Sequence, residues 1–192
     1  EIHERLVGSE MCIRDRGIHN YENVMAASGT ALCMGAPIDV VQRVLKEFWG
    51  VKHRIEFVRD LQGVLYYNDS KATNPDAAIR GIGSMNRKTL LIGGGYDKNL
   101  EFDAWIESFD GKVKCLLLIG QTKDKIAVCA RKHGFENIVC CDTLNEAVNI
   151  CYRLAKPGEA VLLSPACASW GDFKDYTQRG ELFRQYVMEL PE

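Results

Sequence analysis

Short apolar runs alternate along the chain with stretches of helical periodicity. The strand-sized runs are Val64–Tyr67, Thr89–Ile92, Val113–Ile119, Asn137–Cys140 and Glu159–Leu163. The helical stretches are Pro75–Ile82, Phe102–Phe109, Lys123–His133, Leu144–Ala155 and Gly180–Leu190. Apolar strands separated by helices are typical of a mostly parallel sheet covered on both faces. The pattern therefore predicts an α/β fold, a doubly wound, Rossmann-like domain over residues 51–192.

Two of these helical stretches carry a clear apolar face. In Phe102–Phe109, the residues at helical spacing are Phe102, Trp105, Ile106 and Phe109. In Leu144–Ala155, they are Leu144, Ala147, Val148, Cys151 and Leu154. A repeat of three to four residues places such side chains on one side of a helix, so both sets are predicted to face the core.

Residues 17–50 follow a different pattern. Asn20–Ala36 is rich in small residues, and Ile38–Phe48 has apolar side chains spaced for burial: Val40, Val41, Val44, Leu45 and Phe48. Two helices are too few to form a core of their own. We therefore interpret this segment as the end of a preceding domain. Residues 1–16 fit neither pattern and are interpreted as a sequence artefact, with a natural N-terminal extension as the alternative.

Composition and charge narrow the class of protein. The 192 residues carry a net charge of −2, and the basic residues are scattered, which argues against a nucleic-acid partner. No apolar stretch approaches the roughly 20 residues needed to cross a bilayer, and no signal-peptide pattern begins the chain. A cytoplasmic protein without a membrane partner is expected, and we expect a monomer.

The eight cysteines form no C-x-x-C pair, and the four histidines are isolated from them. No metal site is therefore predicted. Most of the cysteines have apolar neighbours, as in Cys115–Leu118 and Ile138–Cys140. They are interpreted as buried, reduced thiols. Cys167 has no candidate base nearby in the sequence, so it is not read as a nucleophile.

Polar loops follow four of the predicted strands: Asn68–Asn74, Gly93–Asn99, Gly120–Thr122 and Ser164–Gly171. In doubly wound sheets, ligands bind in the crevice beyond the carboxyl ends of the strands. The first loop combines a carboxylate, an ammonium, hydroxyls and an amide, which suit ribose and phosphate. The alternative is a helix cap, with Thr73 or Asn74 preceding Pro75. A phosphate-binding P-loop sequence does not occur.

Five segments together resemble the D-glutamate-adding members of the Mur ligase family. The two most specific are Asn-Asp-Ser-Lys-Ala-Thr-Asn-Pro at 68–75 and Ser-Pro-Ala-Cys-Ala-Ser at 164–169. The others, in the order that family has them, are Gly17–Asn23, His53–Glu56 and Gly93–Asn99. The resemblance covers residues 17–192. Gly171 and Asp175 depart from residues that are frequent in related sequences.

The resemblance implies roles for particular residues. Those implied on the ATP side are Asn20, Asn23, Arg54, Asp69, Lys71 and Thr73. Those implied for D-glutamate are Lys98, Ser169 and Tyr176. Simpler alternatives remain for three of them: a helix cap for Asn20, a surface arginine for Arg54 and a solvated loop lysine for Lys98. No catalytic residue is expected within this chain.

The function implied by the resemblance is that of an ATP-dependent ligase in peptidoglycan synthesis. Such an enzyme phosphorylates the carboxylate of UDP-N-acetylmuramoyl-L-alanine, and the amine of D-glutamate attacks the acyl phosphate. The Mg²⁺ ligands of the family are expected in the central domain, outside this chain, so we expect the chain alone to be inactive. The alternatives are a Rossmann-like nucleotide-binding module without catalysis, and a Mur or folylpolyglutamate-type ligase for another amino acid.

Overall fold

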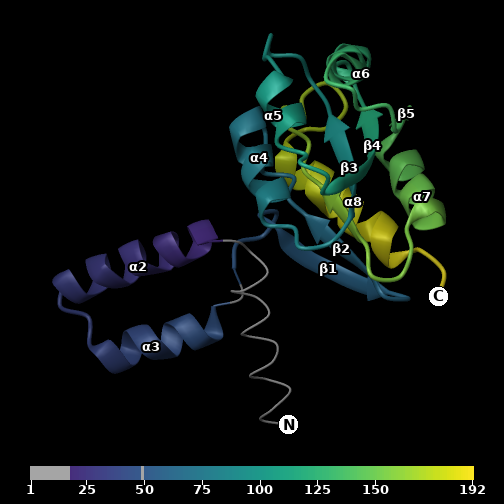
Figure 1. Cartoon of the computed structure of the whole chain (residues 1–192). Helices are drawn as coiled ribbons and strands as arrows, with labels where there is room; N and C mark the ends of the chain where they lie inside the picture. Colours follow the sequence, from purple (N-terminus) through teal and green to yellow (C-terminus); the bar gives the residue numbers. More distant parts are fainter. Residues whose placement is uncertain (1–17, 49) are drawn as a thin grey trace. The chain divides into compact units, whose positions relative to one another are not determined.

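The computed structural model describes residues 18–48 and 50–192 (Figure 1). The predicted artefact at 1–16 lies outside the described residues. The chain divides into two compact units between Val51 and Lys52. Each unit is described by itself.

The first unit contains helices α2 (Ile18–Cys33) and α3 (Ile38–Glu47), which pack against each other. Of the α3 positions expected to be buried, Val41 is buried, whereas Val44 and Phe48 are 53% and 55% exposed. That expectation was wrong for these two residues, because a pair of helices offers too few apolar neighbours to cover them. Other large apolar side chains of this unit are also exposed, namely Met25, Leu32, Met34 and Ile38.

The second unit is built on a six-stranded sheet of order β1-β2-β6-β3-β4-β5. Its strands are β1 (Glu56–Leu61), β2 (Val64–Asn68), β3 (Thr89–Gly94), β4 (Val113–Ile119), β5 (Ile138–Cys140) and β6 (Ala160–Leu163). Strand β1 is antiparallel to β2, and every other pairing is parallel. The predicted doubly wound, mostly parallel sheet is confirmed.

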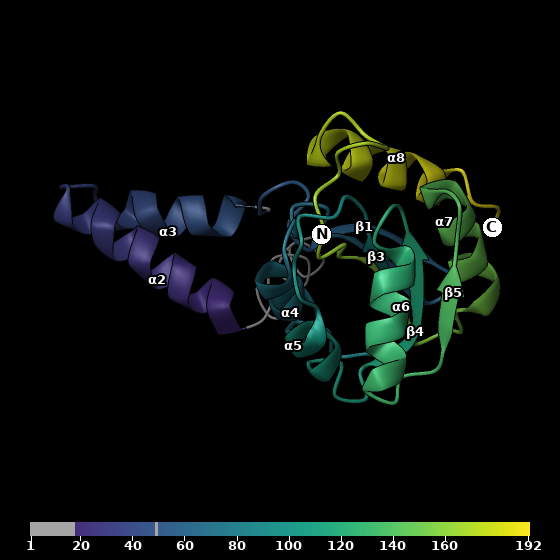
Figure 2. The same ribbon diagram turned by 90° about the horizontal axis from the view of Figure 1, so that it is seen from above.

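Helices cover both faces of this sheet, as Figure 2 shows. One face carries α4 (Pro75–Gly83), α5 (Asp103–Glu107) and α6 (Lys123–Lys132), and the other carries α7 (Leu144–Leu154) and α8 (Tyr176–Met188). Successive side chains of a strand point to opposite faces, so Leu91 joins the first core and Leu90 the second. This double coverage explains why the inner strands are mostly apolar.

Both predicted apolar helix faces were largely correct. Phe102, Trp105, Ile106 and Phe109 are all buried. On α7 the burial holds for every residue of the set except Leu154, the last residue of the helix, which is 44% exposed.

Two features of the second unit were not predicted. Strand β1 mixes exposed and half-buried positions because it lies at the edge of the sheet, so it lacks a continuous apolar run. The two-residue turn Gln62-Gly63 joins it to β2, with φ of 53° and 82°, as hairpins with a right-handed twist require. Helix α8 begins at Tyr176 and not at Gly180, because the Asp175 side chain caps it by accepting from the Gln178 amide at 2.8 Å.

The cysteines of the described residues are unpaired, and four of them are buried: Cys115, Cys141, Cys151 and Cys167. Burial raises the pKa of each of these thiols. The expectation of burial was wrong for Cys140, which is exposed because β5 is the opposite edge strand. Among the described helices, none is both long and apolar enough to cross a membrane.

Candidate functional site at the carboxyl ends of the strands

The four polar loops meet at one edge of the sheet, as the topology predicts. The loop after β2 meets the loop after β6, where the Ser164 hydroxyl donates to Asp69 at 2.8 Å. The loops after β3 and β4 meet where the Gly95 amide donates to the Thr122 hydroxyl at 3.0 Å. The Tyr96 amide donates to the Ala168 carbonyl at 2.9 Å, which ties the β3 loop to the β6 loop.

A groove of about 430 Å³ opens beside the loop after β2. It is lined by Arg54, Lys71, Thr73, Asn74, Asp76, Ala77, Arg80 and Tyr176. Three of these side chains are cationic and one is a carboxylate, so the groove is positive. The amino end of α4 adds to this, because the free amides of a first helical turn attract anions. Arg54, Lys71 and Thr73, predicted on the ATP side, all line this groove.

The loop after β2 also caps a helix, so the cap interpretation is confirmed for Asn74, while the ligand-binding interpretation stays a prediction. The Asn74 side chain accepts from the Ala77 amide at 2.9 Å, and Pro75 occupies the first turn of α4. Capping uses Asn74 and leaves Lys71 and Thr73 half-buried in the groove. A cap alone does not explain the choice of these two residues.

Asp69 lies at the base of the loop and not in the groove. Its carboxylate is 4% exposed and accepts from the Ser164 hydroxyl at 2.8 Å and from the Ile55 amide at 3.3 Å. Burial raises its pKa from 3.8 to about 7, although the Ser164 and Ile55 hydrogen bonds and the charges of Arg54 and Arg179 lower it. These contacts give Asp69 a positioning role, and its direct contact with a nucleotide stays a prediction.

The raised pKa of Asp69 predicts a pH dependence of stability. Between pH of about 4 and about 7 the folded chain holds a proton that the unfolded chain has lost, so the contribution of Asp69 to stability falls as the pH rises through this window. Urea unfolding of Asp69→Asn, whose amide does not titrate, should show a smaller loss between pH 5 and pH 8 than the unchanged chain. The exposed Asp110→Asn is the control. An unchanged loss in Asp69→Asn would contradict the prediction.

Asn68 and His53 form a buried junction beneath the groove. The Asn68 amide nitrogen lies 3.0 Å from Nδ1 of His53 and donates to the Gly180 carbonyl at 3.2 Å. His53 is 5% exposed and is therefore a packed residue. Gly180 permits this contact, because a Cβ there would lie 2.3 Å from His53 Nδ1. The junction joins α8 to the segment that carries Arg54.

Arg179 is the functional candidate that sequence reasoning missed. It is fully buried in α8 and donates to the Ser70 hydroxyl at 3.0 Å, the Ser70 carbonyl at 2.8 Å and the Cys167 carbonyl at 3.1 Å. Burial lowers its pKa to about 10, so it stays charged at neutral pH. Its guanidinium therefore joins the loop after β2 to the loop after β6. The signal available in the sequence was the position of Arg179 shortly after the polar loop Ser164–Gly171.

The three D-glutamate candidates are not all in the groove. Tyr176 lines it, and the Lys71 ammonium lies 5.6 Å from the centre of its ring. Lys98 is exposed and stacks on Trp170, 4.4 Å from the ring centre. Ser169, the residue before Trp170, is 4% exposed. Lys98 thus contacts the residue that follows Ser169, while Tyr176 lines the groove together with residues predicted for ATP.

The remaining candidates lie elsewhere or have another explanation. Asn23 is exposed on α2 in the first unit, and the side chain of Asn20 lies outside the described part of the chain. Cys167 is buried, its sulfur lies 3.4 Å from the Thr122 hydroxyl, and burial raises its pKa to about 11. A protonated, enclosed thiol is a poor nucleophile, as the sequence argument concluded.

The groove suits a polyphosphate better than a bare metal ion. Arg54, Lys71 and Arg80 are donors to phosphate oxygens, and Asp76 is the one carboxylate among the lining residues. Mg²⁺ prefers several oxygen ligands and is commonly held through one or two carboxylates together with substrate phosphates. The lining residues therefore fit a chain of phosphates.

Comparison with known proteins agrees with the fold. The family model described as Mur ligase, glutamate ligase domain, matches residues 53–167. This match covers more than half of the chain, so the chain belongs to the Mur ligase family. Among curated relatives, the UDP-N-acetylmuramoylalanine–D-glutamate ligases of Lachnoclostridium phytofermentans and Lachnospira eligens are 57% and 53% identical over 174 residues.

These matches include 91% of this chain, but they cover only 38% and 39% of the length of the two relatives. Two solved structures share the fold at low identity. The UDP-N-acetylmuramate-alanine ligase of Thermotoga maritima has a TM-score of 0.66 at 16% identity, covering 90% of this chain and 38% of that one. The folylpolyglutamate synthase of Mycobacterium tuberculosis complexed with ADP has 0.65 at 15%, covering 92% and 42%.

Proposed function

We propose that the chain is the C-terminal part of an ATP-dependent ligase that adds D-glutamate to UDP-N-acetylmuramoyl-L-alanine through an acyl phosphate. The observation that carries the proposal is the cationic groove at the amino end of α4, where Arg54, Lys71 and Thr73 come together. The names of the relatives supply the substrate, and the ADP complex of a protein with the same fold supports the nucleotide.

Within this proposal, the chain contributes to binding and orientation. Lys71, Arg54 and Arg80 offset negative charge on the phosphates, and the Thr73 hydroxyl donates to them. Lys98, Ser169 and Tyr176 bind D-glutamate, with Lys98 and Ser169 at its carboxylates. Mg²⁺ would offset phosphate charge from ligands in the central domain. Holding both reactants in place is the larger part of catalysis in such a transfer.

The same proposal covers the organisation of the chain. Residues 17–50 would be the end of an ATP-binding central domain that also presents Asn20 and Asn23, and residues 51–192 the C-terminal domain. The exposed apolar side chains of α2 and α3 support this, since the missing domain would cover them. We expect a monomeric ligase of the cytoplasm, and no ATP hydrolysis by the isolated chain.

A chimera tests this function. Residues 17–192 would replace the corresponding part of the Lachnoclostridium phytofermentans relative, and ADP release would be measured with D-glutamate, L-glutamate, L-lysine and D-alanyl-D-alanine. Activity with D-glutamate alone supports the proposal, whereas a preference for another amino acid identifies a related ligase. An inactive chimera that binds NAD more tightly than ADP by calorimetry would favour a dinucleotide-binding module and overturn the proposal.

Lys98→Ala in this chimera should raise the KM for D-glutamate roughly 10- to 100-fold, because a charge-assisted hydrogen bond to a carboxylate is lost. The KM for ATP should stay within about twofold. Lys125→Ala is a matched control, since Lys125 pairs with Asp97 in the same region at 3.4 Å. An equal rise in the KM for D-glutamate in Lys98→Ala and Lys125→Ala would contradict the assignment of Lys98 to the proposed site.

A further inference from the structure

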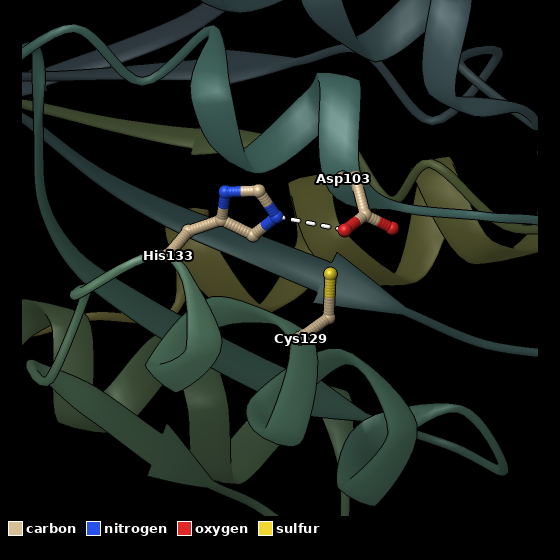
Figure 3. Close-up of side chains that lie close together, drawn as sticks. All are labelled: Asp103, Cys129 and His133. Atoms are coloured by element: carbon tan, nitrogen blue, oxygen red, sulfur yellow. Dashed lines mark hydrogen bonds and ion pairs between the residues drawn. The ribbon is translucent and has the colours of Figure 1, made fainter.

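A cluster of three potential metal ligands lies between α5 and α6, apart from the groove residues. The carboxylate of Asp103, the thiol of Cys129 and the imidazole of His133 each place one ligand atom within 4.8 Å of the other two (Figure 3). Neither the ATP groove nor the proposed D-glutamate site uses any of them. We propose that these side chains form a binding site for a divalent transition-metal ion of the zinc type.

The backbone holds these ligands in place. Cys129 and His133 are four residues apart at the end of α6, where the His133 amide still donates to the Cys129 carbonyl at 3.2 Å, so both side chains share one face. Asp103 is the first residue of α5. The ring of Phe109 packs against the rings of Trp105 and Phe135, with centres 5.5 and 5.2 Å away, and so ties α5 to the end of α6. Ligands on packed helices are better ordered than ligands on loops.

The set of donor atoms favours zinc among common ions. One sulfur, one nitrogen and one oxygen match the ligands that Zn²⁺ takes, with bonds of about 2.0 to 2.3 Å, which place tetrahedral ligand atoms about 3.3 to 3.8 Å apart. Nε2 of His133 now lies 2.7 Å from Oδ1 of Asp103. This pair must open by less than about 1 Å to admit an ion. Mg²⁺ and Ca²⁺ prefer oxygen ligands alone.

Two neighbouring charges affect the site in opposite ways. Glu107 lies 3.6 Å from Nδ1 of His133, where a carboxylate would fix the ring and leave Nε2 free for the metal. The Lys132 ammonium, 3.7 Å from Asp103, repels a cation, but its side chain is 76% exposed and free to turn into solvent. Water would complete the coordination. On binding, the Cys129 thiol forms a bond to the metal and releases its proton to solvent.

The prediction of no metal site rested on the lack of a C-x-x-C pair and missed the spacing Cys129-x-x-x-His133, which a helix brings to one face. Asp103 joins them only in three dimensions, because it belongs to another helix.

The test uses the full chain, reduced and freed of metal, titrated with Co²⁺ and then with Zn²⁺. Co²⁺ should produce the charge-transfer absorption of a cobalt–thiolate bond at one equivalent, and Zn²⁺ should displace it and raise the Tm. Cys129→Ser should abolish this absorption, and His133→Asn and Asp103→Asn should weaken Zn²⁺ binding at least tenfold. Cys140→Ser, which removes the exposed thiol of edge strand β5, should change neither the absorption nor the affinity for Zn²⁺.

The inference does not depend on the proposed ligase function, because every readout is binding or stability. Circular dichroism would check that each variant folds. Absence of the cobalt–thiolate absorption from the unchanged chain would overturn the site. An absorption that survives in Cys129→Ser but disappears in Cys140→Ser would equally overturn it, by assigning the metal to an adventitious thiol.

Discussion

Arg179→Met is expected to lower the free energy of unfolding of the chain by about 2–5 kcal/mol, because each buried acceptor left without its donor costs about 1–3 kcal/mol. The side chain is fully buried and makes three hydrogen bonds, two to Ser70 and one to Cys167. Methionine fills much of the volume but leaves both backbone carbonyls without these donors. Urea unfolding followed by circular dichroism measures the loss.

Arg184→Met is the matched control, because it removes the same groups from the same helix. Arg184 has a side chain that is 49% exposed and one ion pair, with Glu56 at 3.5 Å. Such a surface pair contributes about 0–1 kcal/mol. Arg179→Lys should fall between the two, since one ammonium cannot reach every acceptor of the planar guanidinium. Equal losses for the two methionine variants would show that Arg179 does not hold the loops together.

The fold of the second unit was largely predictable because its sheet is covered on both faces. That coverage gives β3, β4 and β6 buried and mostly apolar runs, a signal that needs no knowledge of neighbours. Edge strand β1 gives no such signal, and only the Gln62-Gly63 turn indicates the hairpin. The burial predicted for Val44 and Phe48 was wrong, because periodicity shows which face of a helix is apolar but not whether another element covers that face.

The sequence predicted which loops meet at the site, but not which of their side chains contact one another. Topology alone brings the carboxyl ends of β2, β3, β4 and β6 to one edge. Burial separates their residues into different roles: Lys71 and Thr73 line the groove, while Asp69 turns inward to Ser164. Arg179 was missed because an arginine in an amphipathic helix is usually exposed, and only tertiary contacts reveal its buried acceptors.

Lys71→Ala in the chimeric ligase is expected to lower kcat/KM for ATP roughly 10- to 100-fold. A charge-assisted hydrogen bond to phosphate is worth about 1.5–3 kcal/mol, which corresponds to a loss of this size. The Lys71 amide donates to the His53 carbonyl at 3.0 Å, so the backbone is held while the side chain enters the groove. Initial rates at varied ATP and saturating D-glutamate measure the change.

The KM for D-glutamate separates a phosphate contact from general damage to the site. If Lys71 acts on the nucleotide, that KM should change by less than about twofold, the reverse of the result expected for Lys98→Ala. Lys156→Ala is the control, because exposed Lys156 precedes β6 and so lies at the opposite end of the strands. A rise in KM for D-glutamate alone would move Lys71 from the ATP side to the amino-acid side. That result is physically reasonable, since the Lys71 ammonium faces the ring of Tyr176, a predicted D-glutamate contact.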